Sequence, residues 1–215
     1  MDEDVVSAIN VRENLIDRME VEISNYLIKM TDQELGDDES HAVTELLNFV
    51  TEFERIGDYA VNIMEKAEEL NEKEASFSES AQKELILLEK AVERILTVTG
   101  EAFEGDDTQK AMQVEPLEEV IDVMVERLRD QHIRRLKDGV CSIDTGVVFL
   151  DVLNNVERIS DHCSNVAVRM IGMEGGEDYD SHTLKSIMHH NPTKDYMLEY
   201  EQCRKEYLVP LEQME

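Results

Sequence analysis

Two carboxylates four residues apart occur twice in this sequence, in the same local setting. Glu54 and Asp58 lie in the stretch TEFERIGDYAVNI, and Glu157 and Asp161 lie in NNVERISDHCSNV. Residues four apart share one face of a helix, so each pair points in one direction. An asparagine follows one turn later in both stretches. The spacing therefore indicates two equivalent oxygen-rich helix faces.

A second carboxylate pair with the same spacing precedes each of these pairs. The first copy has Glu13 and Asp17, and the second has Glu118 and Asp122. If each two helices pack antiparallel, four carboxylates converge in each copy. Two carboxylates about 4 Å apart repel by about 4 kcal/mol at an effective dielectric of about 20. Such a group takes up protons, pairs with arginine or binds a cation, and oxygen ligands alone favour Mg, Ca, Mn or oxophilic iron.

The alternative interpretation is a salt-bridged surface without metal. Glu54 and Glu157 would then pair with Arg55, Arg158 or other basic residues. One E-x-x-x-D is expected by chance in so acidic a chain. Its recurrence in two pairs per copy, in register with an apolar stripe, favours a metal site.

The remaining candidates for chemistry carry weaker signals. His162 follows Asp161 and would be at most a fringe ligand, because its counterpart is Tyr59; we expect a surface histidine. No nucleophile with a base, phosphate-binding loop or Glu-x-x-His di-iron motif occurs, so we predict that the chain is not an enzyme. The tail histidines are expected to be solvated: His182, His189 and His190.

The composition limits the partners and the cellular setting. The 215 residues include 50 acidic and 21 basic ones, a formal net charge of -29. Such a surface repels phosphate backbones, so no nucleic-acid partner is expected. Three cysteines without C-x-x-C indicate reduced thiols in the cytosol. No apolar run approaches the ~20 residues of a membrane span, and the acidic start is unlike a signal peptide, so the chain as given is expected to be soluble.

Apolar residues recur at helical spacing and predict an all-α chain with essentially no strands. Four local signals set the expected boundaries. These are capping-box spacing at Ser76, a helix start or kink at Pro116, a cap at Gly172 and an N-cap at Asn191-Pro192. A loop is expected at 174–180. The expected helices cover residues 5–31, 38–71, 76–105, 107–137, 144–171, 181–190 and 192–208.

The helices with the acidic motifs are duplicated. A shift of 103 carries Glu54 onto Glu157, and a shift of 105 carries Glu13 onto Glu118. The helix expected at 76–105 precedes the second copy, and no counterpart precedes the first. We therefore predict a truncated first repeat at 1–75, a second repeat at 76–175 and a tail at 176–215, in a fragment of a longer protein. The tail helix is a candidate to cover the exposed face of the first repeat.

These motifs resemble the signature of the PhoU family. The stretch from Arg129 to His162 is similar to PhoU-like domains at the C-terminal end of bacterial sodium/phosphate cotransporters, and the tail from Tyr196 to Pro210 resembles their closing helix. The resemblance covers nearly the whole chain. It implies an antiparallel helical bundle of two three-helix repeats, the first of which lacks its first helix.

The resemblance also implies a regulatory role. PhoU proteins are negative regulators of phosphate uptake, so we expect a domain on the cytoplasmic side of the cell membrane that modulates a sodium-dependent phosphate transporter, in the same polypeptide or a separate one. The alternatives are a metal-free acidic scaffold and a stand-alone phosphate-signalling regulator that docks on a basic partner; a homodimer is possible in either case. The family binds iron or zinc clusters, with Mg, Ca or Mn as alternatives here. The implied ligands are Glu54, Asp58, Glu157 and Asp161, with Glu13, Asp17, Glu118 and Asp122 as additions.

Overall fold

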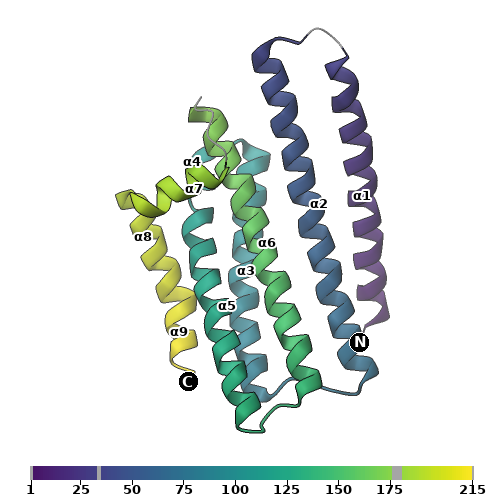
Figure 1. Cartoon of the computed structure of the whole chain (residues 1–215), viewed down its shortest axis with the longest axis vertical. Helices are drawn as coiled ribbons and strands as arrows, with labels where there is room; N and C mark the ends of the chain where they lie inside the picture. The colour runs from purple at the N-terminus through teal and green to yellow at the C-terminus, as the bar shows by residue number, and fades with distance from the viewer. Residues whose placement is uncertain (1, 33–34, 176–180, 215) are drawn as a thin grey trace.

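The computed structural model describes residues 2–32, 35–175 and 181–214, and all their side chains except those of 174–175, 181–182 and 184. These residues form helices joined by short turns, with no strand among them, which confirms the predicted all-α bundle (Figure 1). The helices are α1 (Glu3–Thr31), α2 (Asp37–Glu72), α3 (Glu79–Gly105), α4 (Thr108–Ala111), α5 (Val114–Lys137), α6 (Ile143–Gly175), α7 (Ser181–His190), α8 (Lys194–Cys203), the π-helical turn η1 (Arg204–Leu208) and α9 (Val209–Glu212).

The hydrophobic core lies where α3, α5 and α6 pack against one another. Each helix contributes an apolar stripe with steps of three and four residues, as expected for a helix that faces a core. Burying one such side chain stabilises the fold by about 1.5–3 kcal/mol. This three-helix unit therefore gains the most stability from buried apolar side chains among the described helices. The α5 stripe, at most 1% exposed, consists of Leu117, Ile121, Met124 and Leu128.

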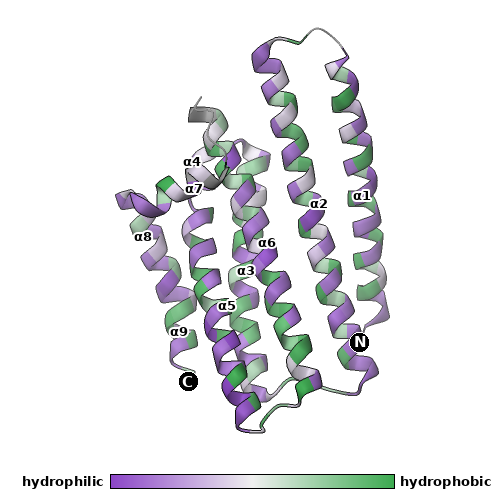
Figure 2. Ribbon diagram, in the orientation of Figure 1, coloured by the Kyte–Doolittle hydropathy of each residue, from purple (hydrophilic) through white to green (hydrophobic). Residues whose placement is uncertain are grey.

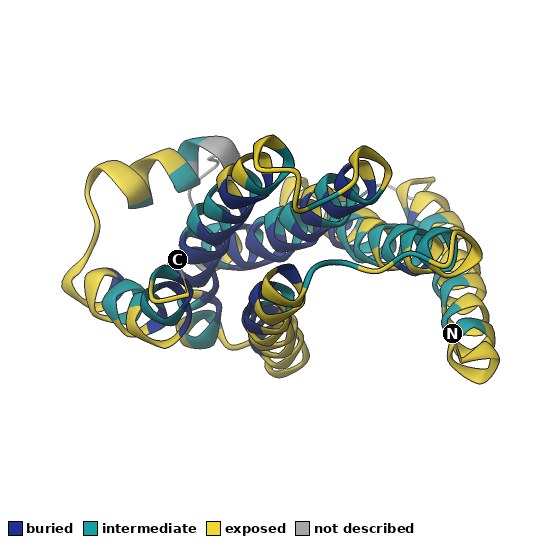
Figure 3. Cartoon of the chain, turned by 90° about the horizontal axis from the view of Figure 1, so that it is seen from below, coloured by how far each residue is buried: buried dark blue, intermediate teal, exposed yellow. Residues whose placement is uncertain are grey.

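The helices α1 and α2 form an antiparallel hairpin, and α2 packs along α6 (Figure 1). Gly57 of α2 allows α1 to approach closely, because a Cβ atom there would lie 3.2 Å from Ile16 Cδ1. Leu27 is the one buried residue of α1, and Figure 3 shows that most of α1 is exposed, whereas buried residues gather in the bundle. Within the described ranges, the first repeat thus has two long helices where the second has three, with the short α4 between two of them.

The start of α3 corrects one sequence prediction. Its N-cap is Ser78, whose hydroxyl accepts a hydrogen bond from the Ala81 N–H at 3.3 Å, and not Ser76. Phe77 packs edge-on against Phe149 of α6, with ring centroids 5.3 Å apart. This contact fixes the chain just before the helix, so the hydroxyl that follows it caps the first turn.

Two predictions about helix ends have opposite outcomes. The expected helix at 107–137 is split into α4 and α5, and Pro116 lies in the first turn of α5, where a missing N–H removes no helical hydrogen bond. Of the two predicted alternatives, a kink or the start of the main helix, the structure has the start. The predicted cap at Gly172 is wrong, because α6 continues to Gly175. The rest of the expected loop, 176–180, lies outside the described residues.

The C-terminal helices also depart from the predicted boundaries. The helix at 181–190 is confirmed, but α8 starts after Thr193, whose hydroxyl accepts a hydrogen bond from the Tyr196 N–H at 3.1 Å, and not after Asn191-Pro192. The helical path then continues past Leu208 to Glu212. Pro210 lacks the N–H that an α-helix would use there, and the turn before it is π-helical.

The tail packs on the second repeat. The helix α8 contacts α5, the turn η1 contacts α5 and α3, and Glu212 of α9 pairs with Arg127 of α5. The tail adds Cys203, Tyr207, Leu208 and Leu211 to the core. The expectation that the tail could cover the first repeat is therefore wrong. Among the described helices, none of the tail packs on the hairpin of α1 and α2.

Hydrophilic and hydrophobic residues alternate along the long helices (Figure 2). None of the helices in the described ranges has the length and apolar character needed to cross a membrane. The division into a first repeat, a second repeat and a tail after residues 75 and 175 stays a prediction.

Candidate metal centres

The first cluster of carboxylates consists of Glu13 and Asp17 on α1 and Asp58 on α2. One oxygen of each lies within 4.8 Å of the other two. The close contact of α1 with Gly57, which precedes Asp58, brings the two helices near enough for this convergence. Burial, the charge and hydrogen bond of Asp17 and the charge of Asp58 raise the pKa of Glu13.

Glu54 lies beside the first cluster without joining its tightest set of oxygens. Burial raises its pKa, and the Asp58 carboxylate, one helical turn away, raises it further; Arg55 opposes this effect. Asp17 also raises it. Glu54 is therefore within electrostatic reach of the first cluster.

The second cluster consists of Glu118 and Asp122 on α5 and Asp161 on α6, again with one oxygen of each within 4.8 Å of the others. It lies deeper than the first. Burial, helped by the charges of Glu115 and Asp122, raises the pKa of Glu118 to about 9. Burial and the charges of Asp161 and Glu157 raise the pKa of Asp122 to about 6. Asp122 Oδ1 is buried and accepts no hydrogen bond from the described residues.

Glu157 has a salt bridge, as the alternative interpretation expected, and its partner is another basic residue rather than Arg158. Arg129 of α5 donates to Glu157 Oε2 at 3.0 Å and also to Asn154 Oδ1. Arg158 instead lies 3.3 Å from Asp161 Oδ2, at a largely exposed position. Glu157 therefore borders the second cluster as the partner of an arginine.

One basic side chain of α7 reaches the second cluster, and another reaches Glu115 beside it. Lys185 Nζ lies 3.9 Å from Glu118 Oε1, and His189 Nε2 lies 2.7 Å from Glu115 Oε1. Glu115 is 1% exposed and also accepts a hydrogen bond from the Ser164 hydroxyl. His189 is exposed, as expected, but its ring also reaches this buried carboxylate.

The other two tail histidines are His190 and His182. His190 is exposed and bonds within its own helix to the Ser186 carbonyl, and the side chain of His182 is outside the described residues. Sequence reasoning overlooked Glu115, although its spacing of three residues from Glu118 places both on one helix face. No sequence signal placed Lys185 there, because the tail has no repeat counterpart.

His162 lies at the contact between α2 and α6 rather than on the surface. Its Nδ1 atom is 2.6 Å from Glu52 Oε2, and its ring stacks on Tyr59 with centroids 5.5 Å apart. Burial would raise the pKa of Glu52, but hydrogen bonds from His162 and Asn165, with nearby positive charge, lower it overall. The expectation of a surface histidine is wrong.

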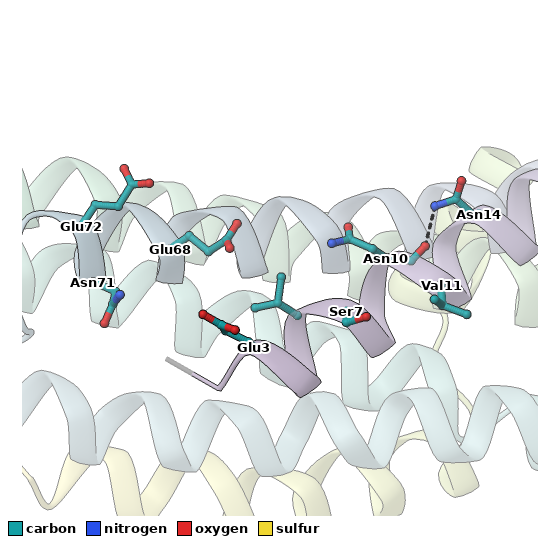
Figure 4. Close-up of a pocket in the computed structure, with 9 residues that line it drawn as sticks. Glu3, Ser7, Asn10, Val11, Asn14, Glu68, Asn71 and Glu72 are labelled. Atoms are coloured by element: carbon teal, nitrogen blue, oxygen red, sulfur yellow. Dashed lines mark hydrogen bonds between the residues drawn. The ribbon is translucent and has the colours of Figure 1, made fainter.

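A polar cavity of about 560 Å³ lies between the first half of α1 and the last turns of α2 (Figure 4). Asn10 and Asn14 lie on one side, with Asn14 Nδ2 donating to the Asn10 carbonyl at 2.6 Å, and Glu68 and Glu72 lie on the other. By the shift of 105, Asn10 corresponds to Glu115. The first repeat thus has an amide where the second has its additional buried carboxylate.

The donor set of both clusters suits a hard cation. Carboxylate oxygens from two helices converge, and the ionised forms are disfavoured by burial and by one another. A divalent ion would neutralise this charge and ligate the unpartnered Asp122 Oδ1. The residues present therefore fit a metal ion, and metal binding itself stays a prediction.

Comparisons with known proteins agree with this duplicated arrangement. A family model described as the PhoU domain matches residues 1–67 and 85–170. The phosphate-specific transport system accessory protein PhoU homolog 1 of Thermotoga maritima is 28% identical over 136 residues, which span 63% of this chain and 58% of that protein. The PhoU homolog of Clostridium acetobutylicum is 24% identical, over 83% of this chain and 81% of its own. The chain thus spans less than two thirds of the Thermotoga relative.

Two solved structures share the fold. The crystal structure of PhoU from Pseudomonas aeruginosa has a TM-score of 0.75 at 20% identity and covers 82% of this chain and 84% of its own. The phosphate transport system regulatory protein PhoU from Streptococcus pneumoniae has a TM-score of 0.70 at 22% identity, with 83% of each chain covered. At these identities the likeness concerns the fold alone.

Proposed function

The chain belongs to the PhoU family, whose domain model matches most of it in two segments, and from this premise we propose that it regulates phosphate transport through two metal-binding acidic clusters. The observation that carries the proposal is the convergence of three carboxylates at equivalent places in both repeats. The Thermotoga and Clostridium relatives are named as accessory proteins of phosphate-specific transport systems, and the Streptococcus pneumoniae protein as a regulatory protein of the phosphate transport system. None of these names denotes an enzyme.

The relatives favour an accessory chain over a domain of the transporter itself. They are named accessory proteins of phosphate-specific transport systems, so the stand-alone regulator accounts for the comparisons better than the expected domain of a sodium/phosphate cotransporter. The partner would then be a separate transport system at the cytoplasmic face of the membrane. A homodimer stays compatible with this function.

In the proposed mechanism, the carboxylates hold the two motif helices of each repeat together when they bind a cation. Glu13, Asp17 and Asp58 would ligate it in the first repeat, and Glu54, whose pKa the charges of Asp58 and Asp17 raise, would be an additional ligand. In the second repeat the ligands would be Glu118, Asp122 and Asp161, with Glu157 held at the border by Arg129. The bound metal, iron or zinc by family resemblance or Mg, Ca or Mn by ligand chemistry, supplies neutralising charge. Its loss would loosen each helix pair and change the surface offered to the transporter.

Metal analysis of protein purified without chelator tests the clusters. We expect a stoichiometric metal in the wild type, and about half of it in the variant Glu118→Gln with Asp161→Asn, which removes one of two sites. The matched control is Glu126→Gln with Asp130→Asn, an exposed pair on the same helix. A wild type without metal, or equal metal in both variants, would rule the clusters out as metal centres.

Phosphate uptake by cells that lack the protein tests the regulatory role separately. We expect uptake to become insensitive to external phosphate, and regulation to return with the wild-type chain but not with a variant altered in both clusters. If that variant restores regulation in full, the regulation of phosphate uptake does not depend on metal binding at the clusters.

A metal-free scaffold is the second candidate, and the ion pairs at the second cluster favour it. Arg129 and Lys185 already supply positive charge to Glu157 and Glu118. Thermal stability that a strong chelator leaves unchanged would support this alternative.

A further inference from the structure

The short helix α7 runs crosswise to the long helices, between the end of α6 and the start of α8 (Figure 1). Two of its basic side chains contact carboxylates of α5. Lys185 Nζ lies 3.9 Å from Glu118 Oε1, and His189 Nε2 lies 2.7 Å from Glu115 Oε1. Glu118 is a member of the second cluster, and Glu115 precedes it by three residues. The helix α7 therefore contacts the second cluster through one side chain and the border of that cluster through another.

The described side chains of α7 hold it on the bundle by charge rather than by apolar burial. None of them is buried, and Ile187 is 44% exposed. A helix of ten residues is only marginally stable unless an apolar face packs against a neighbour. The position of α7 therefore depends on the pairing of Lys185 and His189 with carboxylates of α5, and a change of charge at the second cluster would weaken it.

The glutamates that hold the tail beside the second cluster are peculiar to the second copy. The shift of 105 carries Asn10 onto Glu115, the partner of the α7 histidine. The same shift carries Asn14 onto Glu119, which accepts a hydrogen bond from the Tyr196 hydroxyl of α8 at 2.8 Å. The first copy thus has three cluster carboxylates but an amide at each of these two positions. The two additional glutamates match the contact with the tail, which the first cluster lacks among the described residues.

Lys185 supplies to Glu118 the positive charge that a metal ion would otherwise supply. A cation ligated by Glu118 would lie beside this ammonium, because both would use the same carboxylate. Glu118 is 5% exposed, so water would screen little of the repulsion between the two positive charges. We propose that α7 is a strap on the second cluster, held by Lys185 as an internal cation, and that metal binding at this cluster releases it. This inference rests on the proposed function and states how the second site changes the surface of the molecule.

The affinity of the second cluster for Mn²⁺ tests this competition. The background protein is the full chain with Asp17→Asn and Asp58→Asn, which removes two ligands of the first cluster, so titration calorimetry reports the second cluster alone. We expect Lys185→Met to bind Mn²⁺ at least about tenfold more tightly than this background does. The matched control is Lys194→Met, at an exposed lysine of α8, whose affinity for Mn²⁺ should change less than about twofold.

Hydrogen exchange of the α7 amides provides a second measurement, which does not depend on the affinity. In chelator, Lys185→Met should exchange these amides at least about threefold faster than the background, and Lys194→Met should exchange them at the background rate. Saturating Mn²⁺ should likewise accelerate α7 exchange in the background at least about threefold, without faster exchange in α5. Circular dichroism confirms that both variants fold.

The outcomes separate the strap from the proposed metal binding. If neither the background nor Lys185→Met binds Mn²⁺, the second cluster is not a metal site and both proposals fail there. If Mn²⁺ binds equally well with and without Lys185, or leaves α7 exchange unchanged, the cluster binds metal and the strap is wrong. Slower exchange of α7 in Mn²⁺ would also overturn the strap, because α7 would then help to hold the cation.

Discussion

The individual carboxylates of the second cluster are poorly suited to ionisation where they lie. Burial and like charge raise the pKa of Glu118 to about 9 and that of Asp122 to about 6. A proton, a basic side chain or a metal ion can each relieve this strain. Arg129 is used by Glu157 and Lys185 reaches Glu118, yet Asp122 Oδ1 keeps no partner among the described residues. A divalent ion would be bound by Asp122 Oδ1 and would at the same time neutralise the repulsion among the carboxylates of the second cluster.

At this scale the metal-free chain is expected to lose stability between about pH 5 and about pH 8. Both carboxyls have folded pKa values above their ordinary 4.5 and 3.8, so the folded state binds more protons than the unfolded state. Their contribution to stability is present below about pH 4 and is lost as the pH passes about 6 for Asp122 and about 9 for Glu118. Thermal unfolding in chelator should show Tm falling by at least about 3 °C.

The double variant Glu118→Gln with Asp122→Asn isolates this contribution. It should flatten the dependence of Tm on pH, whereas the exposed pair Glu126→Gln with Asp130→Asn should leave it unchanged. Equal slopes in the wild type and the first variant would show that these carboxyls do not titrate across this range.

At the scale of the helices, the apolar periodicity of the sequence predicted the order of the long helices. The exact helix starts and the ion-pair partners depend on contacts between distant residues. The apolar stripes extend over many turns, so the order of the long helices and the convergence of Glu13 and Asp17 with Asp58 follow from spacing. The choice between two serines at the start of α3 depends on the packing of Phe77, which no local pattern reveals. Arg129 is 28 residues from its partner Glu157. The tail lacks a repeat counterpart, so its approach to the second cluster was not predictable.

The α1–α2 contact should depend on the absence of a side chain at Gly57. A leucine there would meet Ile16, whose Cδ1 atom already lies 3.2 Å from the position of a Cβ atom. We expect Gly57→Leu to destabilise the protein by about 1–3 kcal/mol through overpacking, measured by urea unfolding. It should also lower the metal content of the first cluster.

Gly100 of α3 offers a matched control, because nothing lies within 4 Å of its Cβ position. Gly100→Leu is expected to be neutral or to stabilise the helix by up to about 1 kcal/mol. If both leucine variants have the stability of the wild type, the hairpin does not depend on close approach at Gly57.

In the whole molecule, the helices that carry the two acidic clusters differ in how much of their surface is buried. The second cluster is part of the three-helix unit and has Lys185 and His189 of α7 close by. The first lies on the hairpin, where α1 packs mainly on α2 and has Leu27 as its one buried residue. If both clusters bind a cation as proposed, binding would therefore reduce the motion of the helices more at the first cluster than at the second.

Hydrogen exchange should reveal this difference directly. In chelator, the amides of α1 are expected to exchange at least about tenfold faster than those of α5, since few buried contacts oppose local opening. A divalent cation should slow exchange in α1 and α2 more than in α5, and Asp17→Asn with Asp58→Asn should abolish that slowing. The exposed pair Glu126→Gln with Asp130→Asn should retain it. Equal protection of α1 and α5 without metal would mean that the hairpin is as firmly held as the bundle, and the first cluster could not then act as the responsive element.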